Sequence, residues 1–388
     1  MIETPTSVKS EQFLRKLLNE MVQRNATDMH ISAESPPMLR IDGKLVRMPY
    51  PALSENLARM LALSLMSTAQ RRKFEKDLDI DFSIGIRGLS RFRCNVFHQN
   101  QSIAMAVKAI PFETQTPEEL NIPPEIYHFG RVNAGLVLIA GPRGSGKSTT
   151  QSAILKRLNE ERQQHIITIE EPIEFVYSSS NCIVNQREVM RDTKSYEIAL
   201  ESTPRQDTNI VFVSETNEKD KLVSTLKIAD MGLLVFATMR SRDAVSTVMR
   251  LVDLEIPHYL ISGALRFVIA QRLLRVICPS CKRVVTPDFS LLREIGLDPE
   301  KVKNLKFHRG TGCPKCHGTG YKGRRPIFET LEVTPIMKAM LQAGTSVIEL
   351  WRHAVNEGMV PLRKVALKMM LDGETTLEQV ATETFSYQ

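Results

Sequence analysis

The apolar residues of the first 110 positions switch between helical and strand spacing. Apolar side chains recur every three or four residues from Phe13 to Met21 and from Leu57 to Leu65, which predicts two amphipathic helices. Four shorter runs have strand-like patterns: 38–41, 80–86, 92–97 and 103–110. The pair Asp42-Gly43 follows the first run and is a strong hairpin signal. We therefore predict an N-terminal mixed α/β domain over residues 1–110.

The pattern changes after a proline-rich stretch. Residues 111–128 contain four prolines and are predicted to be an interdomain linker, because proline cannot donate a sheet hydrogen bond. Continuous apolar runs then alternate with helical stretches; the runs lie at 136–140, 165–169, 210–213 and 233–237. Strands without polar alternation are typical of a parallel sheet that is buried on both faces. This pattern predicts an α/β core over residues 129–277.

The last third of the chain is more polar. Residues 278–330 are rich in Gly and Lys and contain four cysteines, which we expect to form a separate module. Residues 331–388 have helical apolar spacing, and we expect these helices to pack against the α/β core.

Composition excludes some classes of protein. The 388 residues contain no stretch close to the ~20 apolar residues of a membrane span, and residues 1–19 lack a signal-peptide core. We therefore expect a cytoplasmic protein that reaches the inner membrane only through partners. The net charge of +7 comes from scattered Lys and Arg, so nucleic-acid binding is not expected.

A phosphate-binding motif follows the first buried run. The segment from Gly141 to Ser148 reads GPRGSGKS and matches GxxxxGK[ST], with a strand before it and a helix after it. Backbone N–H groups in such a loop point at phosphate oxygens, the lysine reaches the outer phosphates, and the serine holds Mg²⁺. A chance glycine-rich turn would not need that strand and helix. The residues expected to bind ATP and Mg²⁺ are Gly141, Gly144, Ser145, Gly146, Lys147, Ser148 and Thr149.

Acidic residues end two other predicted strands. Glu170 and Glu171 follow one buried run, and Glu215 follows another. The carboxyl ends of parallel strands share one edge of the sheet, so these acids should lie on the γ-phosphate side of the nucleotide. One would polarise the attacking water, and the others would complete the Mg²⁺ shell through water.

Two CxxC pairs predict a metal site. Cys278 and Cys281 form the first pair, and Cys313 and Cys316 form the second. Four thiolates surround Zn²⁺ with no open position, which is the structural type of zinc site. Redox pairs and free thiols are the alternatives. The two remaining cysteines, Cys94 and Cys182, lie in strand-like runs and are expected to be structural.

Taken together, these motifs resemble the secretion-type motor ATPases, which power type II secretion and type IV pilus extension and retraction. The likeness runs from about Leu14 to Val380. It rests on the P-loop, on TIEEPIEF at 168–175, on RFRCNVF at 91–97 and on SPPMLRIDG at 35–43. The resemblance implies a PAS-like α+β domain followed by a RecA-like P-loop domain with a zinc module and helices after it. It also implies a homohexameric ring that acts on a membrane platform protein.

The same resemblance assigns residues to catalysis. It implies that Arg93 reaches the nucleotide from the N-terminal domain, with Lys108 in the place of a second arginine. The chain departs from the family at Ser214, where Gly is usual, and at Asn217, where Arg is usual. Arg240 stands where the family has a histidine, so a fixed cation replaces a titratable group. The catalytic set expected from these matches and departures is Glu215, Glu170, Arg93 and Arg240.

Three functional hypotheses follow. The leading one is a hexameric motor that assembles or withdraws a pilus or pseudopilus, and the likeness does not set its direction. The second is a ring or regulatory subunit that binds ATP while an active paralogue hydrolyses it. The third, a nucleic-acid translocase, is disfavoured because the chain has one Trp and few aromatic residues on which bases could stack.

Overall fold

The chain forms two compact units. A computed structural model describes residues 7–24, 26–41, 44–86, 88–110, 114–128, 132–302, 304–316 and 318–384. The first unit comprises residues up to Thr114 together with 172–177, and the second comprises the rest. The predicted turn at Asp42-Gly43 lies outside the described residues, as do residues 111–113 of the predicted linker and residues 129–131 after it. Helices in the described part of the chain are all too short or too polar to cross a bilayer.

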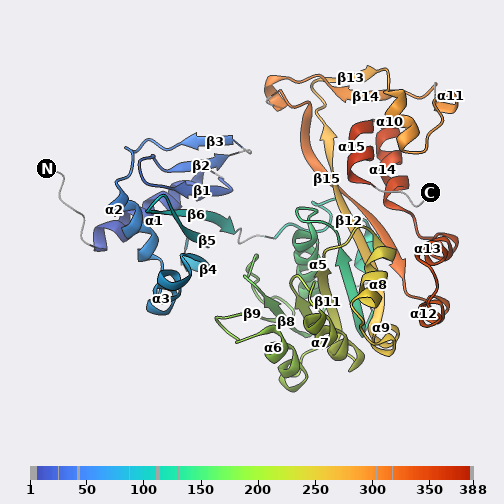
Figure 1. Cartoon of the computed structure of the whole chain (residues 1–388), viewed down its shortest axis with the longest axis horizontal. Coiled ribbons are helices and arrows are strands. Elements are labelled where there is room, and N and C mark those ends of the chain that lie inside the picture. Colours follow the sequence, from blue (N-terminus) through green and yellow to red (C-terminus); the bar gives the residue numbers. More distant parts are fainter. Residues whose placement is uncertain are drawn as a thin grey trace. The chain divides into compact units, whose positions relative to one another are not determined.

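The N-terminal unit is built on one antiparallel sheet with strand order β3-β2-β1-β6-β5-β4 (Figure 1). Its strands are β1 (Asp28–Ile31), β2 (Met38–Ile41), β3 (Lys44–Arg47), β4 (Asp79–Ile86), β5 (Ser90–Gln99) and β6 (Ser102–Ile110). Its helices are α1 (Ser7–Gln23), α2 (Glu55–Ser64) and α3 (Thr68–Asp77). The predicted helices and strands are confirmed. The pattern missed α3, which buries only Phe74, although a Ser67–Gln70 capping box marks its start.

Strand register separates an apolar face of this sheet from a polar one. Leu39, Met29, Val107, Cys94 and Phe82 are paired in turn across five strands, and all are buried. The neighbouring row consists of residues 40, 28, 108, 93 and 83 and must face the other way, because side chains alternate along a strand. This alternation places Arg93 and Lys108 on the polar face.

The second unit contains a seven-stranded sheet with order β15-β12-β7-β11-β10-β8-β9. The predicted buried strands are confirmed, and all neighbouring pairs are parallel except β12 and β15. The strands are β7 (Gly135–Ala140), β8 (His165–Glu170), β9 (Ile183–Glu188), β10 (Ile210–Val213), β11 (Leu234–Met239), β12 (Leu265–Ile277) and β15 (Tyr321–Glu332). The helices are α4 (Pro124–His128), α5 (Lys147–Glu161), α6 (Tyr196–Ser202), α7 (Lys219–Asp230), α8 (Ala244–Asp253) and α9 (His258–Ala264).

Pro204 does not interrupt a helix in this structure. Helix α6 ends at Ser202, and a short 3₁₀ turn, Thr203–Gln206, contains the proline near its start. Proline is tolerated there because the first N–H groups of a helical turn have no intrahelical partner. Pro204 therefore does not carry the cost of a proline in a helix interior.

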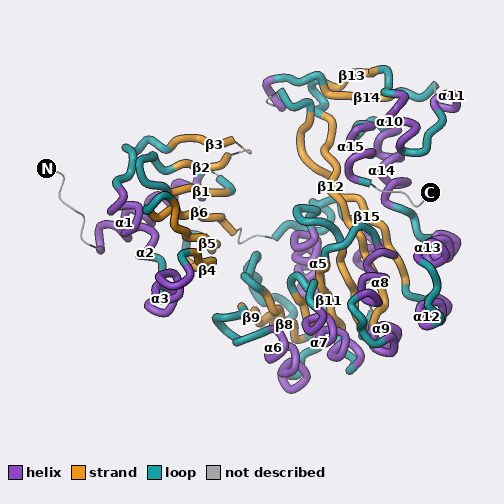
Figure 2. The backbone as a smooth tube through the Cα atoms, in the orientation of Figure 1, coloured by secondary structure: helices purple, strands orange, loops and turns teal. Residues whose placement is uncertain are grey.

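The cysteine segment lies at the end of a long hairpin. Strands β12 and β15 continue beyond the sheet, and the small sheet of β13 (Lys282–Val285) and β14 (Phe307–Gly310) sits at their far end (Figure 2). This segment also contains α10 (Phe289–Glu294) and α11 (Pro299–Val302), which the apolar pattern did not predict. The C-terminal helices are α12 (Pro335–Gln342), α13 (Val347–Asn356), α14 (Leu362–Leu371) and α15 (Leu377–Glu383). They bury their apolar faces in the core of the α/β sheet, as predicted.

Candidate nucleotide and zinc sites

The P-loop connects β7 to α5. Gly146 is the N-cap of α5 in the left-handed region, φ 90°, and no side chain caps the helix, so its first N–H groups remain available to an anion. A side chain at Gly141 would come within 2.6 Å of the backbone oxygen of Gln271, so this position requires glycine. Lys147 is buried, and its Nζ donates to the carbonyls of Gly141 and Pro142, both at 2.9 Å. The loop is thus folded around its own lysine.

Gln271 is a site residue that sequence reasoning missed. It lies on β12, is 1% exposed, and its Nε2 donates to the P-loop carbonyl of Ser145 at 2.9 Å. Its Oε1 and the hydroxyl of Ser145 are both buried without a hydrogen-bond partner among the described residues. Unsatisfied buried polar atoms beside an open helix N-terminus are consistent with a site completed by a polar ligand. No local pattern marks Gln271, because 126 residues separate it from Ser145.

The acidic residues are brought to the P-loop edge of the sheet, as expected. Four neighbouring strands of the sheet end at this edge. The P-loop follows β7, residue 240 follows β11, residue 215 follows β10, and residue 170 ends β8. Glu170 accepts hydrogen bonds from the Thr168 hydroxyl at 2.6 Å and from the Gln186 amide at 3.1 Å. These two donors hold one carboxylate oxygen of Glu170 in a defined position.

Glu215 is bound by Arg240. The guanidinium donates from Nη2 to Oε2 of Glu215 at 2.7 Å and from Nε to the other carboxylate oxygen. The backbone N–H of Arg240 also donates to Oδ1 of Asn217 at 2.8 Å. This bidentate pair, with a smaller contribution from Asn217, lowers the pKa of Glu215. Glu215 is therefore ionised at neutral pH, with the Arg240 side chain over its carboxylate.

Arg93 belongs to the N-terminal unit. It lies directly opposite Lys108 on the neighbouring strand, and its Nε is 3.6 Å from a carboxylate oxygen of Asp81. Both side chains of this ion pair are well exposed, so it contributes little to stability. The polar face of the sheet therefore presents two adjacent cations, one of them loosely paired.

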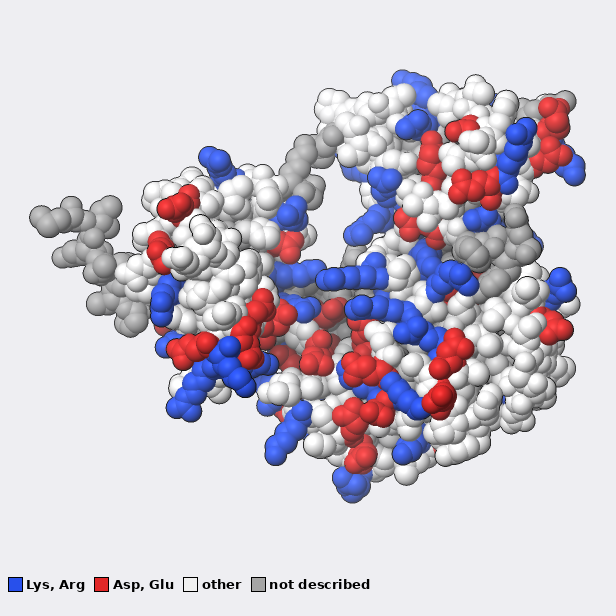
Figure 3. Space-filling model, in the orientation of Figure 1, with Lys and Arg blue, Asp and Glu red and all other residues white. Residues whose placement is uncertain are grey.

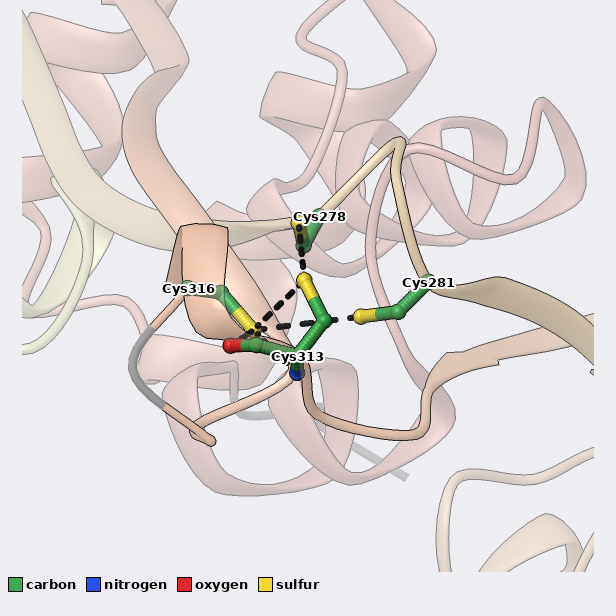
Figure 4. A group of neighbouring side chains, drawn as sticks. All are labelled: Cys278, Cys281, Cys313 and Cys316. Atoms are coloured by element: carbon green, nitrogen blue, oxygen red, sulfur yellow. Dashed lines mark hydrogen bonds between the residues drawn. The ribbon is translucent and has the colours of Figure 1, made fainter.

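The four cysteines converge at the end of the hairpin. All four sulfurs lie within 4.8 Å of one another, and the side chains point toward one another (Figure 4). Cys278 and Cys313 are 3.9 Å apart, Cys281 and Cys316 are 3.8 Å apart, and Cys313 and Cys316 are 3.7 Å apart. A tetrahedral ion with Zn–S bonds of ~2.3 Å requires sulfur separations of about 3.8 Å. The four sulfurs therefore fit Zn²⁺.

Backbone donors support a thiolate at Cys316. Its sulfur accepts N–H bonds from Cys313 at 3.1 Å and from Gly320 at 3.3 Å. Burial raises the pKa of this thiol, but the backbone N–H groups and neighbouring cysteines outweigh burial and lower it to about 6. The four sulfurs that the cysteine spacing singled out do cluster, and the fold supplies backbone hydrogen bonds to one of them.

The cysteine segment also carries most of the net charge. Residues 278–330 contain eleven Lys and Arg but only five Asp and Glu, and the net charge of the whole chain is +7. Lys and Arg side chains are visible over β13 and β14 at the top of Figure 3. The positive charge of the chain is therefore concentrated in this segment rather than spread evenly along the sequence.

Known proteins are similar to this chain over most of its length. The family model described as "Type II/IV secretion system protein" matches residues 5–382. The type IV pilus retraction ATPase PilT of Pseudomonas aeruginosa is 39% identical over 270 residues, which cover 68% of this chain and 78% of PilT. The type IV pilus ATPase PilU of the same organism is 28% identical over 94% of this chain and 86% of PilU.

Two further similarities cover nearly the whole chain. The type IV pilus assembly ATPase PilB of Thermus thermophilus is 31% identical over 97% of this chain, which spans only 43% of PilB. A crystal structure of the pilus retraction motor PilT with bound ADP superposes with a TM-score of 0.78 at 31% identity and covers 96% of each chain. With the P-loop edge described above, these matches show that the chain belongs to the Type II/IV secretion system protein family, the secretion-type motor ATPases.

Proposed function

We propose that this protein hydrolyses Mg·ATP and, as a ring of six copies, drives assembly or retraction of a type IV pilus or a type II pseudopilus. The observation that carries the proposal is the convergence of Lys147, Glu170, Glu215 and Arg240 on one edge of the parallel sheet. ATP would lie on the N-terminus of α5, where the side chains of Lys147 and Ser148 serve the phosphates and Mg²⁺. An inner-membrane platform protein would be the partner that the ring moves.

Each acid would have its own task. Glu215, ionised and close to the P-loop, would orient the attacking water, and Glu170 would complete the Mg²⁺ shell through water. Arg240, with Arg93 from the N-terminal sheet, would neutralise charge that develops on the transferred phosphoryl group. Arg240 must share or release Glu215 when the γ-phosphate arrives.

The Arg240–Glu215 pair also favours a second candidate function. A carboxylate held on both oxygens by a guanidinium is poorly placed to orient water, so the chain would then bind ATP without turning it over. It would act as a regulatory ring subunit beside an active paralogue.

The deciding experiment is steady-state ATP turnover at several protein concentrations, with Glu215→Gln measured in parallel. For a self-sufficient motor we expect turnover per subunit to rise as rings form and to fall at least about 100-fold in the variant. Nucleotide binding without turnover in the wild type would reject the motor and leave the partnered subunit. Absence of nucleotide binding would reject both functions.

Replacing Arg240 tests its role as a cation. Arg240→Ala is expected to lower turnover about 100-fold, the usual effect of losing one charge-stabilising donor. Neither Arg240 nor Glu215 should make wild-type turnover depend on pH between 5.5 and 8. Arg240 stays protonated in this range, and Glu215 stays ionised because its pKa is lowered. Arg240→His should lose activity as pH rises through about 6.5, where imidazole loses its charge.

The two variants separate catalysis from restraint. Faster turnover in Arg240→Ala than in the wild type would contradict the catalytic role and show that Arg240 restrains Glu215. A pH-independent Arg240→His variant would show that charge at this position is irrelevant.

A further inference from the structure

Glu329 is a buried carboxylate between two helix N-termini. It lies on β15, is 3% exposed, and accepts the backbone N–H of Ala244 at 2.8 Å and of Leu362 at 3.1 Å. These donors are the first residues of α8 and α14, each ten residues long. The N-cap of α14, Pro361, makes no side-chain capping bond, so Glu329 supplies the acceptor that this helix end otherwise lacks.

The first of these helices is continuous with the nucleotide edge. Helix α8 begins four residues after Arg240, and its N-cap is Asp243. Arg272 of β12 donates to the carbonyl of Arg242, so the short connection between Arg240 and α8 is fixed to β12. A displacement of Arg240 from Glu215 therefore acts on a segment whose end is fixed by Arg272 and Glu329.

Strand β12 contacts both the P-loop and the connection that precedes α8. Gln271 binds the carbonyl of Ser145, and the next residue, Arg272, binds the connection before α8. Successive side chains of a strand point to opposite faces, so β12 contacts the phosphate loop on one face and the Arg240 connection on the other. Glu329 is adjacent, paired in register with Ala270.

Burial and hydrogen bonding act on the charge of Glu329 in opposite directions. Burial raises its pKa to about 7, although the N–H groups of Ala244 and Leu362 favour the charged form. Asp243 opposes that form, and Arg272 favours it. A neutral amide at this position has one acceptor oxygen and cannot satisfy both helix N-termini with the geometry of a carboxylate.

We propose that Glu329 is a positioning residue that couples the nucleotide edge to the C-terminal helices, by holding the N-termini of α8 and α14 on one carboxylate. Nucleotide that moves Arg240 shifts α8, and through Glu329 it changes the order of α14. Helix α14 passes this change to the end of α15, because Arg363 donates to the Thr384 carbonyl at 2.7 Å. The inference rests on the proposed function only in requiring that the P-loop bind nucleotide.

Hydrogen exchange of the full-length protein, with and without a saturating non-hydrolysable Mg·ATP analogue, tests this coupling. In the wild type we expect protection of the P-loop amides and a change of about 5- to 150-fold in exchange of α14 amides, the usual range for coupled sites. In Glu329→Gln the P-loop should still be protected, but exchange in α14 should no longer respond. Glu332→Gln is the matched control, because Glu332 is exposed on the same strand.

The outcomes separate this inference from the proposed function. Absence of P-loop protection in the wild type would overturn the proposed function itself. Protection of the P-loop without a response in α14 would overturn the coupling and leave ATP binding intact. A response retained in Glu329→Gln would also overturn it. If Glu329→Gln does not fold, Glu329→Asp keeps the charge but is too short to reach both N–H groups, and the same loss of response is expected.

Discussion

Removal of zinc, or of one of its four thiolates, is expected to unfold the tip of the β12–β15 hairpin. The four cysteines form a small cluster of their own, apart from the main core, and metal binding supplies about 10–16 kcal/mol of apparent folding free energy in small zinc modules. Cys313→Ser should therefore bind less than one equivalent of zinc and show rapid hydrogen exchange in β13 and β14. Metal content by mass spectrometry and exchange of the same sample measure both effects.

The loss is expected to spread to the C-terminal helices. Helix α10 of the cysteine segment contacts α15, and strand β14 contacts α14, so loosening the module should speed exchange in those two helices. Cys182→Ser is a matched control, since its thiol donates to the Arg162 carbonyl at 3.0 Å and a hydroxyl can do the same. An unaltered β13–β14 in zinc-free Cys313→Ser would show that the metal is not structural.

Lys147→Ala is expected to abolish nucleotide binding at ordinary concentrations. Nζ of Lys147 donates to the carbonyls of Gly141 and Pro142, so the ammonium group lies within the loop that is expected to hold the phosphates. Removing one partner of a buried, hydrogen-bonded charge pair costs about 2–5 kcal/mol, or roughly 30- to 5,000-fold in Kd. Isothermal titration with ADP and with a non-hydrolysable ATP analogue measures the loss directly.

The matched control for this variant is Lys227→Ala. Lys227 is exposed near the end of α7, so the substitution removes a positive charge without touching the P-loop. Similar losses of affinity in the two variants would mean that net charge, rather than the P-loop lysine, attracts the nucleotide. Wild-type affinity in Lys147→Ala would place the nucleotide elsewhere.

Short sequence patterns were enough to predict the P-loop, the four-cysteine cluster and most strands and helices. GPRGSGKS defines its own local structure, because glycines permit the tight loop and the flanking strand and helix are marked by apolar spacing. Two CxxC pairs similarly define a four-sulfur set, since each pair already places two thiolates within reach of one ion. The alternation in β5 and β6 also implied which face would carry Arg93, once the register was known.

Tertiary structure alone decided which distant residues meet. Gln271 contacts the P-loop from 126 residues away, and Arg240 covers Glu215 because β10 and β11 are neighbours in the sheet. Glu329 joins the start of α8 to the start of α14, and nothing in the residue spacing indicates that these two helix ends share one carboxylate. Such contacts depend on strand order and on where helices end, and residue spacing along the chain contains neither. Short sequence motifs therefore indicate the phosphate site and the cysteine site, whereas only the fold determines which residues contact those sites.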